Sequence, residues 1–226
     1  MYLLLAHWPI HINVVAWSVL NMSSLRVRHS IQYIQYLYDS REDRSKLENL
    51  IRAFRGIQAL PPDDPKSFFY LAGLHGLPFR GPGVTDPDWY GGYCWHSTVL
   101  FPTWHRIHLL EFENALRSIP GCQDVTLPFW DELVPEIVYS EDPADPEKKE
   151  FWVPKILTSP TFELDGRNDN PLYSYKLQEA LITNVTPDQS RSSKPKDYET
   201  VRYPFAGEYH VPASCYNFRM LIYAVY

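Results

Sequence analysis

The 226-residue sequence has few cysteines and no excess of positive charge, and each shortage excludes a class of protein. Its 3 cysteines stand at unrelated spacings, so neither a disulfide framework nor a zinc knuckle is expected. Lysine and arginine total 21 against 27 acidic residues, a net charge of −6, and they form no basic stripe. Because nucleic-acid-binding proteins carry a clustered positive surface, we expect no nucleic-acid partner.

The sequence also lacks an uninterrupted hydrophobic run at its start. The first residues, 1–24, are apolar, but His7, Pro9, His11 and Asn13 interrupt them, and a membrane span needs about 20 mainly apolar residues. No basic residues open the segment, so it makes a poor signal peptide. The two histidines have the spacing of a helical metal pair, but the proline between them argues against a helix. We therefore expect a soluble protein without membrane association, and the sequence leaves its compartment open.

Hydrophobic and aromatic residues are abundant, at 45% and 15% of the sequence, which suits one globular domain with a substantial core. Between residues 24 and 59, apolar residues recur every three or four positions on either side of a charged segment, 39–46, which predicts two helices. Residues 133–196 are rich in proline, aspartate and serine, so we expect long surface loops with short pieces of helix or strand, packed around the site. The predicted fold class is mainly α, a helical bundle with long loops.

The stretch richest in reactive side chains runs from Gly91 to Glu113, GGYCWHSTVLFPTWHRIHLLEFE, and holds three histidines and a cysteine. Neutral imidazole is a suitable ligand for copper, zinc, iron or nickel. The single Cys94 cannot make a thiolate cage. The stretch therefore predicts a metal site held mainly by histidine.

Helical periodicity distinguishes these histidines. From Pro102 onward the pattern predicts a helix with His105 in its buried stripe, followed by Leu109, Phe112 and Leu116. His96, nine positions before His105, would face the opposite side of one straight helix, so we expect it on a loop, which Gly91-Gly92 permits. His108 lies three residues after His105 on the same face, a spacing that can bind metal. We interpret it as a polar helix position rather than a ligand.

A further candidate is His75, which lies in the apolar segment Phe68 to Phe79. A helix that ends near Gly76 and Pro78 would present His75 inward. Taken alone, a histidine on an apolar face is more often a core residue than a metal ligand. The pattern around His75 therefore leaves both interpretations open.

His96 to Glu113, HSTVLFPTWHRIHLLEFE, resembles the first copper-site signature of the tyrosinases, in which His, Phe, Trp-His-Arg and a downstream Glu recur at this spacing. Four other segments resemble fungal tyrosinases, polyphenol oxidases of the type 3 copper family, in the same order: HGLP at His75, GGYC, IPGCQDVTLPFWDE and YETVRYP. The resemblance covers residues 25–206, most of the chain.

The resemblance implies a tyrosinase-like helical bundle and three ligands for the first copper, His75, His96 and His105. Cys94 matches the cysteine that fungal members link to the histidine two residues on through a thioether. Phe101 matches an aromatic residue that packs on the ligands, although a phenylalanine there is by itself more often core. Glu113 matches the downstream glutamate, a residue we expect to support the ligands. At His108 the family usually carries an aromatic residue.

The same resemblance implies an oxidoreductase that uses dioxygen to oxidise monophenols or o-diphenols to o-quinones, as in melanin or pigment formation. Family members use two coppers, each held by three histidines, yet only His210 follows His108 in this sequence. We therefore expect one copper site, the first-site half of the centre, and no turnover by this chain alone. Two alternatives stay open: a non-catalytic copper-binding or partner-binding remnant, and an oxygen carrier of the haemocyanin type. The Cys-x-His motif at His96 favours tyrosinase over the carrier.

The resemblance divides the chain into an N-terminal extension, 1–24, a copper-binding domain, 25–206, and a tail, 207–226. The tail matches nothing expected of the family, and we hypothesise that it is a translated intron. A bundle without the second-site helices would leave apolar faces uncovered near His75 and His105. Such faces favour self-association, so we expect poor solubility of the chain expressed alone.

Overall fold

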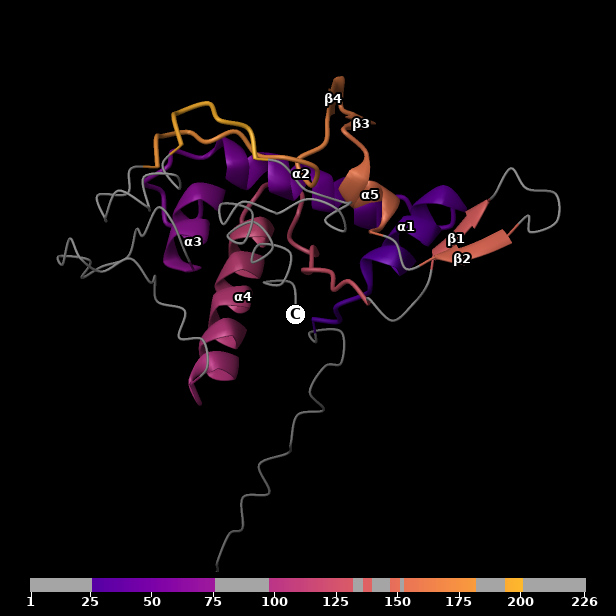
Figure 1. Cartoon of the computed structure of the whole chain (residues 1–226), viewed down its shortest axis with the longest axis horizontal. Coiled ribbons are helices and arrows are strands. Elements are labelled where there is room, and N and C mark those ends of the chain that lie inside the picture. The colour runs from indigo at the N-terminus through magenta and orange to yellow at the C-terminus, as the bar shows by residue number, and fades with distance from the viewer. Residues whose placement is uncertain are drawn as a thin grey trace, which may run out of the picture.

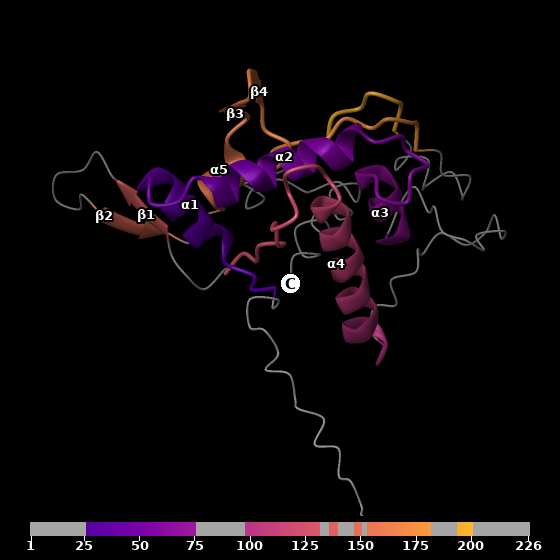
Figure 2. The same cartoon turned by 180° about the vertical axis from the view of Figure 1, so that it is seen from behind.

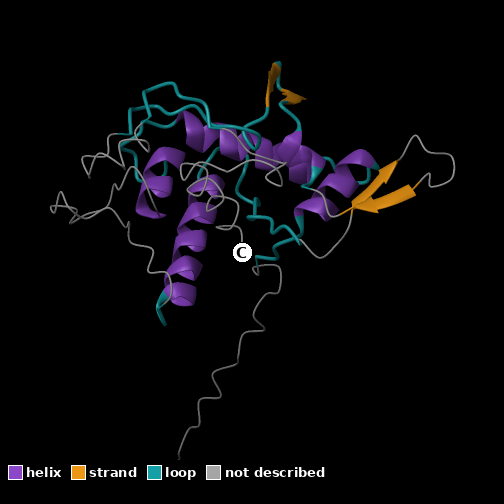
Figure 3. Ribbon diagram, viewed as in Figure 1, coloured by secondary structure: helices purple, strands orange, loops and turns teal. Residues whose placement is uncertain are grey.

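The computed structural model describes residues 26–75, 98–131, 136–139, 147–150, 153–181 and 194–200, with the backbone alone for the two four-residue ranges (Figure 1). Several positions singled out above lie outside these residues: Cys94, His96, His210 and the segments 1–24 and 207–226. The described chain is mainly helical, as the sequence predicts, with two short hairpins (Figure 3). Within these ranges no helix has both the length and the apolar character needed to cross a bilayer.

Two helices occupy the region between residues 24 and 59, which confirms the interpretation of its apolar periodicity. α1 (Ile31–Asp39) begins after Ser30, whose Oγ accepts a hydrogen bond from the Tyr33 N–H at 3.1 Å and so caps the helix. α2 (Ser45–Ala59) follows a turn in which the Asp43 carboxylate accepts the Ser45 N–H at 3.0 Å. The charged segment connects the helices because most of its side chains stay in water while the apolar faces on either side are buried.

α3 (Phe68–His75) and α4 (Phe101–Arg117) lie on the same side of α2, near one of its ends (Figures 1 and 2). The hydroxyl of Ser67 accepts the Tyr70 N–H at 3.0 Å and caps the start of α3. Pro102 stands in the first turn of α4, where its missing N–H would have no helical partner in any case. The helix predicted from Pro102 onward is therefore confirmed.

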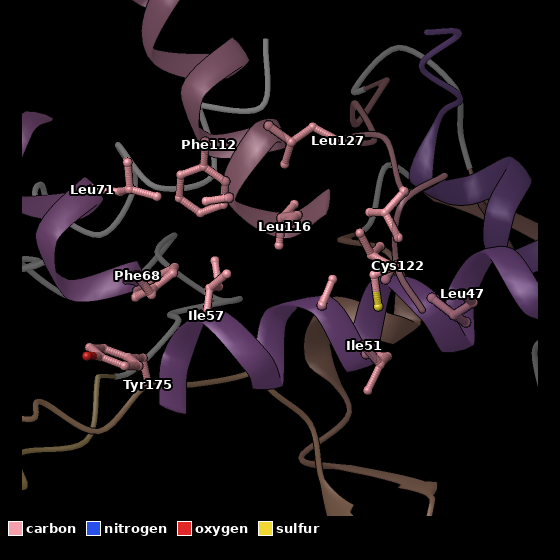
Figure 4. Close-up of a cluster of buried hydrophobic side chains, with 14 of the residues drawn as sticks. Leu47, Ile51, Ile57, Phe68, Leu71, Phe112, Leu116, Cys122, Leu127 and Tyr175 are labelled. Atoms are coloured by element: carbon pink, nitrogen blue, oxygen red, sulfur yellow. The ribbon is translucent and has the colours of Figure 1, made fainter. Parts of the chain in front are cut away.

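The hydrophobic core lies where α2 meets the helices around it (Figure 4). The ring of Phe112 on α4 packs near those of Phe54 and Phe68, with centroids 5.9 and 6.0 Å apart. Behind the end of α4, Ile119 fills the space over Gly56, where an added Cβ would lie 2.7 Å from two side-chain atoms of Ile119. The absence of a side chain on Gly56 therefore lets α2 and the α4 end approach closely.

The remaining described elements are short. β1 (Glu136–Tyr139) and β2 (Glu147–Glu150) pair antiparallel, with Glu136 opposite Glu150. α5 (Lys155–Thr158) precedes β3 (Thr161–Leu164), which pairs antiparallel with β4 (Arg167–Asp169). Asp165 and Gly166 connect β3 to β4 with φ values of 54° and 73°, the left-handed pair that a tight hairpin turn requires.

Residues 153–181 differ from the surface loops that the sequence predicts. Five of their hydrophobic side chains are buried in the core: Ile156, Phe162, Leu164, Tyr175 and Leu177. The guanidinium of Arg55 on α2 donates to the backbone oxygens of residues 162, 164 and 169 at 2.9, 2.9 and 2.6 Å. This segment therefore packs on α2 as part of the core. The short helix and strands predicted within it are present.

Candidate metal centre

α3 and α4 bring together two of the histidines singled out in the sequence. The Nε2 atoms of His75 and His105 lie 3.2 Å apart, and the ring planes meet at 72°. Both residues are buried, with 8% and 9% of their surfaces exposed. His75 stands at the last residue of α3 and His105 in the second turn of α4, so the site lies where the two helices face each other.

A backbone contact fixes the tautomer of His105. Its Nδ1 lies 2.7 Å from the carbonyl oxygen of Phe101, one helical turn earlier. Because a carbonyl oxygen only accepts hydrogen bonds, Nδ1 carries the proton and Nε2 offers its lone pair. That lone pair points at Nε2 of His75, which donates to it in the metal-free pair. A metal ion between the rings would replace this proton.

The spacing of the two nitrogens fits a shared metal ion. Imidazole nitrogens bind such ions at about 2.0–2.1 Å, and two ligands at a tetrahedral angle are then roughly 3.3 Å apart. The observed Nε2–Nε2 distance of 3.2 Å is close to this value. A hydrogen-bonded Nδ1 on a metal-binding histidine is also the usual arrangement, because it fixes the ring orientation.

Aromatic rings surround the pair. The Phe101 ring lies 4.1 Å from the His105 ring between centroids, and its side chain is 40% exposed. Phe101 therefore contacts a predicted ligand at the protein surface and is not a core residue. The Trp104 ring contacts both histidines, with centroid distances of 5.7 Å to His75 and 5.0 Å to His105. These rings limit the access of water to the Nε2 atoms.

His108 lies in the same cluster, although the sequence suggested only a polar helix position. It is 6% exposed, and its ring stacks on Trp104 with centroids 4.9 Å apart and planes 19° from parallel. Its centroid is 5.8 Å from that of His75. Burial, and then repulsion from His105, lowers the pKa of His108 to about 4, so it is neutral at pH 7. Its spacing of three residues from His105 was the only sequence signal.

Glu113 lies about 12 Å further along α4 than His105, two turns away. Its carboxylate accepts hydrogen bonds from Arg28 Nε at 3.0 Å, Arg26 Nη1 at 3.2 Å and the Leu127 N–H at 2.9 Å. Burial raises the pKa of Glu113, but these donors, the Leu127 N–H first, outweigh it and leave the pKa lowered. Glu113 thus holds the segments before α1 and after α4 against this helix, and its hydrogen bonds do not reach the histidines.

The described residues supply two of the three predicted copper ligands. His96 and Cys94 lie outside them, so the loop position of His96 and its thioether stay predictions. Within the described ranges, no three His, Cys, Asp or Glu side chains are arranged to hold a metal ion together. His75 and His105 therefore form a pair that needs a further ligand to complete a site.

Comparison with known proteins identifies the class to which this pair belongs. The common central domain of tyrosinase matches residues 65–218, a range that includes both histidines. The chain is 51% identical over 194 residues to tyrosinase HcTyr2 from Hahella sp., which covers 82% of this chain and 32% of the relative. It is 43% identical over 167 residues to a tyrosinase from Aspergillus oryzae, covering 73% of this chain and 28% of the relative.

A solved tyrosinase from Burkholderia thailandensis at low pH has the same fold. The TM-score is 0.61 at 41% sequence identity, covering 87% of this chain and 37% of the bacterial one. The chain belongs to the tyrosinase family. Its relatives include bacterial and fungal members, so the resemblance is confirmed for the family as a whole and not for the fungal branch alone. The chain spans about a third of the length of the curated relatives that it matches.

Proposed function

We propose that this chain carries the first copper site of a tyrosinase-type phenol oxidase, with His75, His96 and His105 as its ligands. The observation that carries the proposal is the 3.2 Å approach of two buried imidazole nitrogens, one of which has its lone pair fixed toward the other. Two facing histidine nitrogens suit copper, and membership of the tyrosinase family favours it over zinc, iron or nickel. His96 is assigned as the third ligand because it lies in the copper-site signature that the sequence shares with the family.

In this proposal the protein orients the ligands and keeps the site dry, while bound copper supplies the electron exchange with dioxygen. The Phe101 carbonyl holds the Nδ1 proton of His105, so Nε2 stays available as a ligand without a change of tautomer. The Nε2 proton of His75 leaves to solvent when the metal enters. Trp104 and Phe101 pack against the ligand rings and help to hold their orientation.

The substrates that we propose are monophenols or o-diphenols, with an o-quinone as the product and dioxygen as the oxidant. The full sequence holds only His210 after His108, so these 226 residues provide no second histidine triplet downstream of the first. Oxidation of a diphenol to a quinone removes two electrons, whereas one copper exchanges one. We therefore propose that this polypeptide by itself binds one copper and does not turn over.

Copper content tests the ligand assignment. The purified chain, loaded with copper and freed of excess metal, should retain about one copper per molecule by elemental analysis. His75→Ala combined with His105→Ala should abolish this retention, because both facing nitrogens are lost. His29→Ala is the matched control, since that ring contacts Tyr33 and not the histidine pair. Full copper retention by the double variant would show that the ligands are misassigned.

Oxygen uptake with a catechol tests the catalytic part. The copper-loaded 226-residue chain should consume no more oxygen than the same amount of free copper in buffer. Sustained uptake at near-stoichiometric copper would contradict the proposal of a single site. The additional ligands would then have to come from His7, His11, His29 or His108, or from a second molecule.

A further inference from the structure

His108 occupies an unusual environment for an imidazole. Only 6% of its surface is exposed, although it lies on the helix that faces His75. Its ring contacts the rings of Trp104 and His75. These contacts involve the flat imidazole ring, so the shape of the ring matters for the packing.

The ring of Trp104 connects His108 to both candidate ligands. One contact is face to face with His108, at 4.9 Å and 19°. The others are inclined, at 53° to His75 and 75° to His105. A shift of the indole would therefore move against both ligand rings at once, and the stacked ring of His108 opposes such a shift.

His75 packs against the same rings. The carbonyl of Phe101 fixes the ring of His105 through Nδ1. His75 stands at the last residue of α3, and three of its described neighbours are the rings of Trp104, His105 and His108. Rings contributed by α4 therefore pack around the His75 ring, whose Nε2 lies 3.2 Å from that of His105.

We propose that His108 is a positioning residue, whose ring holds Trp104 in place and thereby fixes the ring of His75 in the orientation that binds metal. The proposal rests on the proposed function, because it assigns His75 as a ligand. Direct ligation by His108 is the competing explanation. It is disfavoured because His75, His105 and His108 do not form a group of three that could hold an ion.

Two variants separate the explanations. His108→Phe keeps a flat ring for the stack and removes both nitrogens, whereas His108→Ala removes the ring. We expect His108→Phe to keep the copper affinity within about 2-fold and the paramagnetic resonance spectrum of the bound Cu(II) unchanged. His108→Ala should weaken copper binding by about 10-fold, as loss of supporting contacts does, and alter that spectrum. Equal losses in both variants would show that a nitrogen of His108 matters, which overturns the packing role.

A metal-free measurement keeps the inference testable if copper binding itself fails. The ring resonances of His75 in the metal-free chain should shift in His108→Ala and stay in place in His108→Phe. In a Trp104→Leu background, His108→Ala should shift them little further, because its stacking partner is already lost. Unchanged His75 resonances in His108→Ala would refute the inference. A wild-type chain that binds no copper would refute the proposed function without deciding this point.

Discussion

Replacing Glu113 with glutamine should destabilise the fold, because three donors converge on this one buried carboxylate. Arg28, Arg26 and the Leu127 N–H donate to its two oxygens, and the side chain is 1% exposed. Glutamine has the same shape, but it has a single acceptor oxygen and presents an NH₂ group where the second oxygen stood. At least one donor then faces another donor, and both arginines lose their counter-ion.

The size of the loss follows from the burial of the partners. Removing one member of a fully buried ion pair costs about 3–5 kcal/mol. The arginine side chains are 37% and 33% exposed, so water replaces part of what they lose. We expect Glu113→Gln to lower the free energy of unfolding by about 2 kcal/mol at pH 7, close to one hydrogen bond to a charged group. Glu111→Gln, an exposed change on the same helix, should stay within about 0.5 kcal/mol of wild type.

The destabilisation caused by Glu113→Gln should depend on pH. The pKa of Glu113 is lowered in the folded protein, so its contribution is fully present above the ordinary carboxyl pKa of about 4.3. It is lost as the pH falls through the lower folded pKa. Urea unfolding followed by tryptophan fluorescence should therefore show a constant gap between wild type and Glu113→Gln near neutral pH, which narrows on acidification. A gap below about 0.5 kcal/mol at pH 7, or one that widens in acid, would refute the reasoning.

Two further predictions concern packing and association. Gly56→Ala should lower the melting temperature, because the cost of overpacking against Ile119, about 1–3 kcal/mol, exceeds the gain in helix propensity, about 1 kcal/mol. In an Ile119→Ala background the same substitution should no longer lower the melting temperature. A loss that persists in that background would contradict this cause. Ile107 and Leu110 are 63% and 43% exposed on one face of α4. Changing both to glutamate should therefore reduce self-association, measured by size-exclusion chromatography. An unchanged elution profile would show that this face is not responsible for the association.

Helices α1, α2 and α4 could be predicted because their apolar residues recur at helical spacing along the buried face of each helix. Leu109, Phe112 and Leu116 mark the buried face of α4 within one stretch of chain, and the structure confirms it. The meeting of His75 with His105 joins residues 30 positions apart, which local periodicity does not encode. Only the resemblance to tyrosinases indicated that pair.

Two buried polar residues escaped prediction for different reasons. The sequence suggests that Arg55 is an exposed charged position of a helix, but the structure buries it against backbone oxygens that accept its hydrogen bonds. Backbone oxygens are present at every residue, so the sequence does not show which of them will pair with an arginine. His108 is predicted to be a polar helix position because the sequence shows that its side chain can ionise. The sequence does not show that aromatic rings surround it in the fold. The pattern of side-chain types therefore predicts apolar burial well and polar burial poorly.

The contacts of Arg55 also set an order of events during synthesis. Its three acceptors lie 107 to 114 residues further along the chain. At about 5–20 residues per second, the ribosome needs roughly 5 to 20 s to make that length. During this interval α2 can form, but its arginine has none of the acceptors that permit burial. The face of α2 that carries Arg55 must therefore stay hydrated until the β3–β4 hairpin emerges, and the core is complete only after Tyr175 and Leu177 have followed it.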